Sequence, residues 1–99
     1  MNRIRMTKEA ERNLAQIRAL IALDSKETAK RFVQKLRTAI RSVRRFPEAG
    51  SLVPDFDRTD LRETFVGSYR IIYHIKGSDI FIVKVIHGAR QLPDSLGRL

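Results

Sequence analysis

Hydrophobic and polar residues recur with two different periods along this chain, and the change of period separates a helical half from a strand half. Near the N-terminus, Ile4 and Met6 alternate with arginines, which predicts a short strand. Apolar residues then recur at helical spacing in two stretches, separated by a break at Asp24-Ser25. Because the break is short, the two predicted helices should fold back on each other as an antiparallel hairpin.

The ends of both predicted helices carry local signals. Thr7 is a suitable N-cap for the first helix. Asp24, with Glu27 three residues later, has the spacing of a capping-box variant for the second helix. Phe46-Pro47 ends that helix, since the residue before proline disfavours helical geometry.

Residues 61–87 change to β-prone runs separated by two turns. Gly67-Ser68 stands between two such runs, and a two-residue loop containing glycine favours a β-hairpin. Residues 76–79 form the second turn, and the third run ends at His87. The chain is therefore predicted to be α+β with the order β-α-α-β-β-β. The helical hairpin packs on one face of a small, mainly antiparallel sheet.

The turns also predict a register for this sheet. A two-residue turn pairs Val66 with Tyr69, and the next turn pairs Ile75 with Ile80. On this register Arg70 and His87 share the face that the two helices leave uncovered. The apolar residues on that face are Phe65, Ile72, Phe81, Val83 and Val85.

Such an apolar face predicts a binding surface, because two helices can cover only one side of the sheet. The C-terminal residues 91–99 are expected to shield part of it through Leu92, Leu96 and Leu99. A partner chain would cover the rest.

Length and composition predict one small domain spanning residues 1–99. The chain contains no cysteine, which fits the cytoplasm, and its apolar runs are too short to span a bilayer. The two histidines lack a clustered carboxylate set, so we expect no metal site and no cofactor.

Positive charge is concentrated in the first half of the chain. The whole chain carries a net charge of +9, of which residues 1–54 contribute +8. Basic residues of the second predicted helix recur at spacings that place them in one stripe. These residues are Lys26, Lys30, Arg37, Arg41 and Arg44. The stripe predicts either a surface for nucleic acid or an acidic protein segment, or a solvated helix face.

Five short motifs follow one another in a defined order. Phe46-Pro47-Glu48-Ala49-Gly50 comes after the second helix. The strands carry Leu61-Arg62-Glu63, Val66-Gly67, Tyr69-Arg70-Ile71-Ile72-Tyr73 and Val85-Ile86-His87-Gly88-Ala89-Arg90. In this order the motifs resemble the RelE/ParE superfamily, the toxins of type II toxin–antitoxin modules.

The RelE-like branch of that superfamily consists of ribosome-dependent mRNA endonucleases. The resemblance implies that Arg70 and Arg90 would then contact phosphate. His87 would transfer a proton and Glu48 would act as a base. However, the chain has no aromatic residue after Phe81, where RelE-like enzymes place a tyrosine, and it lacks their lysine pair before the hairpin.

The ParE-like branch, which poisons DNA gyrase by binding, is the closer resemblance. It implies a toxin that has no catalytic residues, and a cognate antitoxin whose acidic C-terminal segment binds it in a hetero-oligomer. Two alternatives remain: a RelE-like ribonuclease acting on ribosome-bound mRNA, and a non-toxic remnant that only binds its antitoxin.

Overall fold

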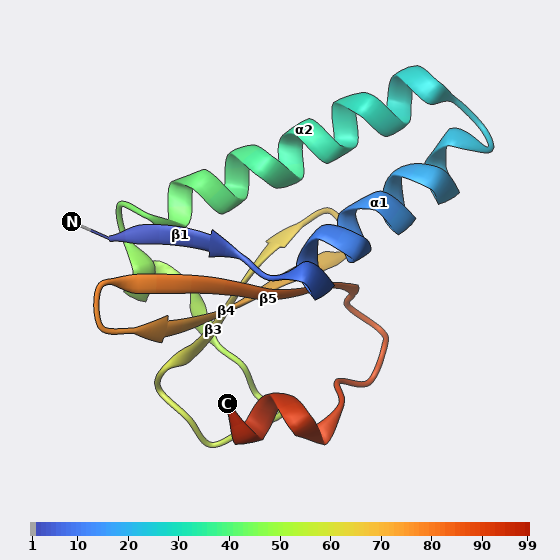
Figure 1. Cartoon of the computed structure of the whole chain (residues 1–99). Coiled ribbons are helices and arrows are strands. Elements are labelled where there is room, and N and C mark those ends of the chain that lie inside the picture. The colour runs from blue at the N-terminus through green and yellow to red at the C-terminus, as the bar shows by residue number, and fades with distance from the viewer. Residues whose placement is uncertain (1) are drawn as a thin grey trace.

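The protein consists of a helical hairpin on one face of a five-stranded sheet in the computed structural model, which describes residues 2–99 (Figure 1). The elements in chain order are β1 (Arg3–Met6), α1 (Lys8–Ala22), α2 (Lys26–Val43), the 3-10 helix η1 (Pro47–Ala49), β2 (Ser51–Leu52), β3 (Leu61–Val66), β4 (Tyr69–Lys76), β5 (Asp79–His87) and the 3-10 helix η2 (Asp94–Arg98). The strand order in the sheet is β1-β5-β4-β3-β2, with β1 parallel to β5 and the other pairs antiparallel. The predicted α+β fold is confirmed, and β2 is an addition to it.

Both helices begin at side-chain caps. The hydroxyl of Thr7 accepts a hydrogen bond from the backbone N–H of Ala10 at 3.1 Å, as predicted. The prediction of a cap at Asp24 is wrong: Ser25 caps α2 by accepting from the N–H of Thr28 at 3.2 Å. Asp24 lies in the turn just after α1, where its N–H bonds the carbonyl of Ile21. Within residues 2–99, neither helix combines the length and apolar character that crossing a membrane requires.

The first hydrophobic core lies between the helical hairpin and the sheet. Leu14 of α1 and Leu36 of α2 are buried against Ile71, Ile80 and Ile82. This arrangement follows from the apolar stripes of the two helices and the alternation along the strands.

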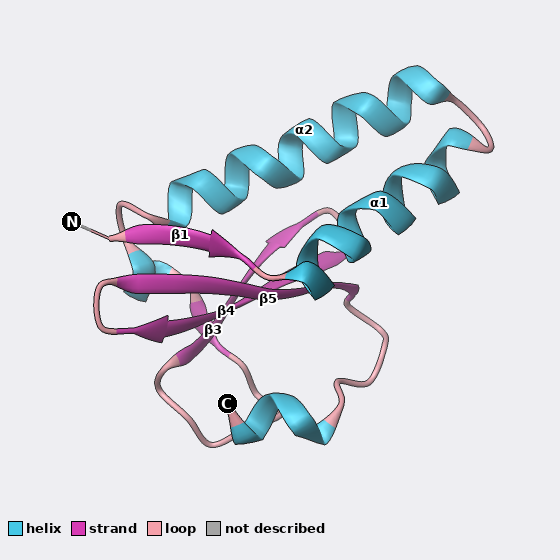
Figure 2. Cartoon of the chain, in the orientation of Figure 1, coloured by secondary structure: helices cyan, strands magenta, loops and turns pink. Residues whose placement is uncertain are grey.

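The second core lies on the other face of the sheet, and the chain itself covers it. Leu61, Ile72 and Val83 of the sheet pack with Val53 from the loop before β3 and with residues 91–99, which we call the tail. The tail contributes the buried side chains of Leu92 and Leu96 to this core, whereas the side chain of Leu99 is exposed. Figure 2 shows η2 on the side of the sheet opposite to α1 and α2. The prediction of an uncovered groove is therefore wrong at Ile72 and Val83.

A β-bulge in β5 changes which residues share a face. Ile71 pairs with Val85 but Tyr73 pairs with Ile82, so β5 carries one extra residue between these pairs. The predicted pairs Val66–Tyr69 and Ile75–Ile80 are both confirmed. Beyond the bulge the faces exchange, and Val85 joins the core under the helices. The second face of the sheet is the one opposite the two helices, and the prediction that Val85 and His87 lie on it is thus wrong.

The segment after α2 is held against the sheet by Tyr73. The Tyr73 hydroxyl donates to the carbonyl of Pro47, and burial raises the pKa of this phenol. A Cβ at Gly50 would lie 2.1 Å from that hydroxyl oxygen. The close approach accounts for glycine at this position of the Phe46–Gly50 motif.

Candidate functional site

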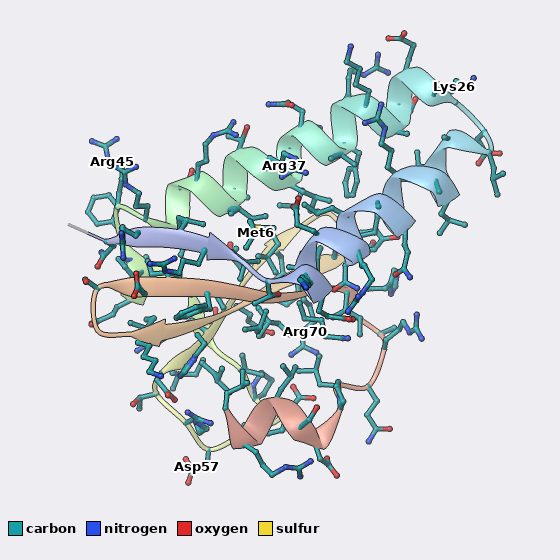
Figure 3. All side chains as sticks on the ribbon, viewed as in Figure 1. Met6, Lys26, Arg37, Arg45, Asp57 and Arg70 are labelled. Carbon is teal, nitrogen blue, oxygen red and sulfur yellow. The ribbon has the colours of Figure 1, made fainter. Side chains whose placement is uncertain are left out.

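Arg70 lies at the centre of a buried ion network on the second face of the sheet (Figure 3). Its Nε donates to Glu63 Oε1 at 2.7 Å, and its Nη2 donates to Asp55 Oδ1 at 2.9 Å. The side chains of Arg70 and Glu63 are only 7% and 6% exposed. Burial disfavours the charged guanidinium, but the two carboxylates outweigh it and raise the pKa of Arg70.

The sequence predicted that Arg70 would contact phosphate if the protein were RelE-like, but in the structure its guanidinium binds two carboxylates instead. The pairing with Glu63, three residues before the hairpin turn, follows from the register, because Phe65 pairs with Arg70 and Glu63 is diagonal to it. Asp55 comes from the loop between β2 and β3, and the sequence carries no signal for its role. By binding both carboxylates, Arg70 of β4 holds β3 and the loop between β2 and β3 together on the second face.

His87 lies on the opposite face of the sheet from Arg70. Its ring meets that of Tyr69 edge-on, with 5.5 Å between ring centroids, and Tyr69 in turn contacts Phe32 of α2. His87 Nδ1 accepts a hydrogen bond from the N–H of Ala89 at 3.2 Å. The predicted sharing of one face by His87 and Arg70 is wrong, because the bulge reverses the side-chain alternation.

A cleft of about 540 Å³ lies between α1 and the end of β5, and both His87 and Arg90 line it. It exists because β1 pairs with β5 only as far as Ile82. Beyond that point β5 has no neighbouring strand on this side among residues 2–99. There the side chain of Asn13 in α1 takes the place of a strand partner, because its Oδ1 accepts a hydrogen bond from the N–H of Val85 at 2.9 Å. Across the cleft Lys84 donates to Glu9 at 3.2 Å, and this contact is the main cause that lowers the pKa of Glu9.

The sequence reasoning missed Asn13. The available signal was a polar residue placed within the apolar stripe of the first helix, one position before Leu14.

Glu48 lies far from His87. It lines a groove together with Ile75 and Gly77, at the turn between β4 and β5. Ile75 pairs with Ile80, and seven strand residues from there to His87 span roughly 20 Å. The structure therefore does not bring together the four residues predicted for a nuclease: Arg70, His87, Arg90 and Glu48. No group of metal-ligating side chains occurs in residues 2–99.

The predicted basic stripe along α2 divides into two parts. Arg37 pairs with Glu11 of α1 at 3.3 Å, which joins the two helices. Lys26 and Lys30 are exposed near the start of α2, whereas Arg41 and Arg44 are exposed at its other end.

A second ion cluster joins the loop before β3 to the tail. Arg58 Nε donates to Asp60 Oδ1 at 2.8 Å, and Arg58 Nη1 donates to the carbonyl of Gly97 at 3.1 Å. His74 Nε2 lies 2.9 Å from Asp60 Oδ2. The bond from Arg58, followed by that from His74, lowers the pKa of Asp60 from 3.8 to about 2.

This cluster predicts a loss of stability in acid. The pKa of Asp60 is lower in the folded state than in the unfolded state. Its contribution to the free energy of unfolding is therefore fully present above about pH 4 and disappears as the pH falls toward 2. Asp60→Asn should lower the free energy of unfolding at pH 7, and its difference from wild type should shrink across this window. Urea unfolding at pH 7, 4 and 2 measures the difference.

The matched control is Asp57→Asn, because Asp57 is exposed and points away from the sheet in Figure 3. It should change stability little at each pH. A difference between Asp60→Asn and wild type that stays constant from pH 7 to pH 2 would contradict the assignment.

Two comparisons relate the chain to known proteins. A family model described as the ParE toxin of type II toxin–antitoxin system, parDE, matches residues 4–92. Among solved structures, the chromosomal ParDE TA system from P. aeruginosa contains a chain with a TM-score of 0.75 and 19% sequence identity. The alignment covers 88% of this chain and 96% of that chain, and at this identity it shows a shared fold. No curated protein matches the chain.

Proposed function

The chain belongs to the ParE toxin family of type II toxin–antitoxin systems, and from this premise we propose that it inhibits DNA gyrase by binding it, without catalysis. The observation that most supports a binding inhibitor is the state of Arg70. Its guanidinium is buried between Glu63 and Asp55, so it is not presented to a phosphate. A nuclease would need that charge on the scissile phosphate.

The separation of the other candidates supports the same proposal. General acid–base catalysis needs groups within hydrogen-bond reach of one substrate. His87 and Arg70 lie on opposite faces of the sheet, and Glu48 lies at the far end of β5 from His87. We further propose that residues 1–99 form a single toxin domain.

We propose an antitoxin as the second partner, bound in a hetero-oligomer through an acidic C-terminal segment. The basic half of the chain supports an acidic partner. Of the five residues predicted for the antitoxin groove, Phe65 is 54% exposed and Phe81 is half-buried. These two remain candidate contacts, whereas Ile72, Val83 and Val85 are buried within the chain.

The proposal is tested with purified wild type and His87→Ala in two assays, gyrase supercoiling and ribosome-dependent mRNA cleavage. We expect both proteins to inhibit supercoiling and neither to cleave mRNA, because His87 is not a proton-transfer group in a binding inhibitor. Loss of a general acid or base would lower a cleavage rate by about 10²–10⁴-fold.

The control for folding is circular dichroism of both proteins, since the ring of His87 contacts Tyr69. Cleavage by wild type that is lost in His87→Ala would identify a RelE-like ribonuclease instead. Inactivity of the folded wild type in both assays would indicate a non-toxic remnant.

A further inference from the structure

A shallow groove of about 820 Å³ lies between the C-terminal end of α2 and the edge strand β1. Its lining residues are Asn2, Arg3, Ile4, Arg41, Arg44 and Arg45. Four of the six are arginines, and none of the lining residues is acidic. Because they come from β1, from α2 and from the turn after α2, the groove is a product of the tertiary structure.

Two arginines of this groove, Arg3 and Arg41, lack a carboxylate of their own among the contacts that the structure describes. Arg37, Arg58 and Arg70 each contact a carboxylate of their own. By contrast, Arg41 bonds the hydroxyl of Thr38. Arg3 shares the carboxylate of Asp79 with Arg5, at 3.4 Å and 3.2 Å. Because no carboxylate of residues 2–99 lines the groove, the arginines that line it give its surface a positive potential.

The kind of cation also differs along α2. Residues 26–35 include Lys26, Lys30, Arg31 and Lys35, whereas all the cationic residues of the groove are arginines. Figure 3 shows Lys26 and Arg45 at opposite ends of the helix. A guanidinium is planar and can bind a phosphate through two parallel hydrogen bonds, which an ammonium cannot do. The groove therefore has the chemistry of a phosphate site.

The groove is poorly suited to other polyanions. A protein partner gains most of its affinity from apolar and aromatic anchors, and Ile4 is the one apolar residue that lines the groove. Single-stranded nucleic acid is bound through stacking on aromatic rings, and no ring lines the groove. Phe46, which is 70% exposed, lies in the adjoining groove.

We propose that this arginine groove binds the phosphodiester backbone of duplex DNA without reading its sequence. Arg41 lies in the last turn of α2 and Arg45 in the turn that follows it, and both line the groove. From one groove, both guanidinium groups can reach phosphates of one strand. The inference goes beyond the proposed function, because it concerns DNA and this chain alone, whether or not gyrase is the target.

The test measures binding of a short fluorescein-labelled duplex by fluorescence anisotropy at a series of salt concentrations. For wild type, log K should fall linearly with log salt. Arg41→Gln/Arg45→Gln should reduce the magnitude of that slope by about 2, since each phosphate contact contributes about 0.9. The matched control is Lys26→Gln/Lys30→Gln, which removes the same charge at the other end of α2 and should leave the slope unchanged.

All these positions are exposed, so each variant should keep the circular dichroism spectrum of wild type. Equal changes of slope in the two double variants would overturn the proposal, because binding would then reflect net charge alone. Tighter binding of a poly-glutamate peptide than of the duplex would overturn it in favour of an acidic protein. A preference for single-stranded DNA that Phe46→Ala abolishes would overturn the assignment to duplex. The assay contains no gyrase, so these results are independent of the target.

Discussion

Replacing Arg70 with alanine should lower the free energy of unfolding by about 3–5 kcal/mol, because the change leaves a buried carboxylate without its partner. That carboxylate belongs to Glu63, which is buried and accepts a hydrogen bond from Arg70 Nε at 2.7 Å. Asp55, the second partner, is partly exposed and can be hydrated instead. Urea unfolding followed by circular dichroism measures the loss.

Two variants control this experiment. Arg12→Ala removes an arginine from an exposed pair with Glu9 and should cost little stability. Arg70→Met/Glu63→Met removes both buried charges and keeps similar volumes, so it should be far more stable than Arg70→Ala. If Arg70→Ala proved as harmless as Arg12→Ala, the network would not be a buried one.

Leu92→Ala should destabilise the protein by about 2–5 kcal/mol, the usual cost of truncating a buried leucine and leaving a cavity. Leu92 is 4% exposed and packs in the second core with Ile72 and Val83. The tail has no strand pairing of its own, so this burial is a main part of what holds it on the sheet. The same unfolding experiment measures the effect.

Leu99→Ala is the matched control in the same segment, because Leu99 is 48% exposed and lies outside the second core. It should change stability by only a few tenths of a kcal/mol. Equally small effects at both positions would show that the tail does not cover the second face in solution.

Local pattern predicted the elements and much of the sheet register from the sequence. Gly67 adopts a positive φ of +57°, which the two-residue turn requires, and that turn pairs Val66 with Tyr69. The salt bridge between Glu63 and Arg70 follows directly from this register. Thr7 likewise caps α1 because a helix start depends on residues three or four positions apart.

The bulge in β5 was not predictable from alternation. Residues 80–83 are all apolar, so alternation does not mark the position of the extra residue there. One inserted residue then moves Val85 and His87 to the face under the helices. That shift alone separates His87 from Arg70, and it removes the main geometric argument for a nuclease.

The sequence by itself therefore determined the order of elements, the two hairpins, the family resemblance and the uneven charge. Only the tertiary structure decided which residues meet across long separations. Asp55 reaches Arg70, Asn13 bonds the backbone of Val85, and Leu92 covers Ile72. The arginine groove arises in the same way, from the approach of α2 to β1. The physical reason is that period and capping act within a few residues, whereas covering a sheet face or completing a strand edge depends on how whole elements pack.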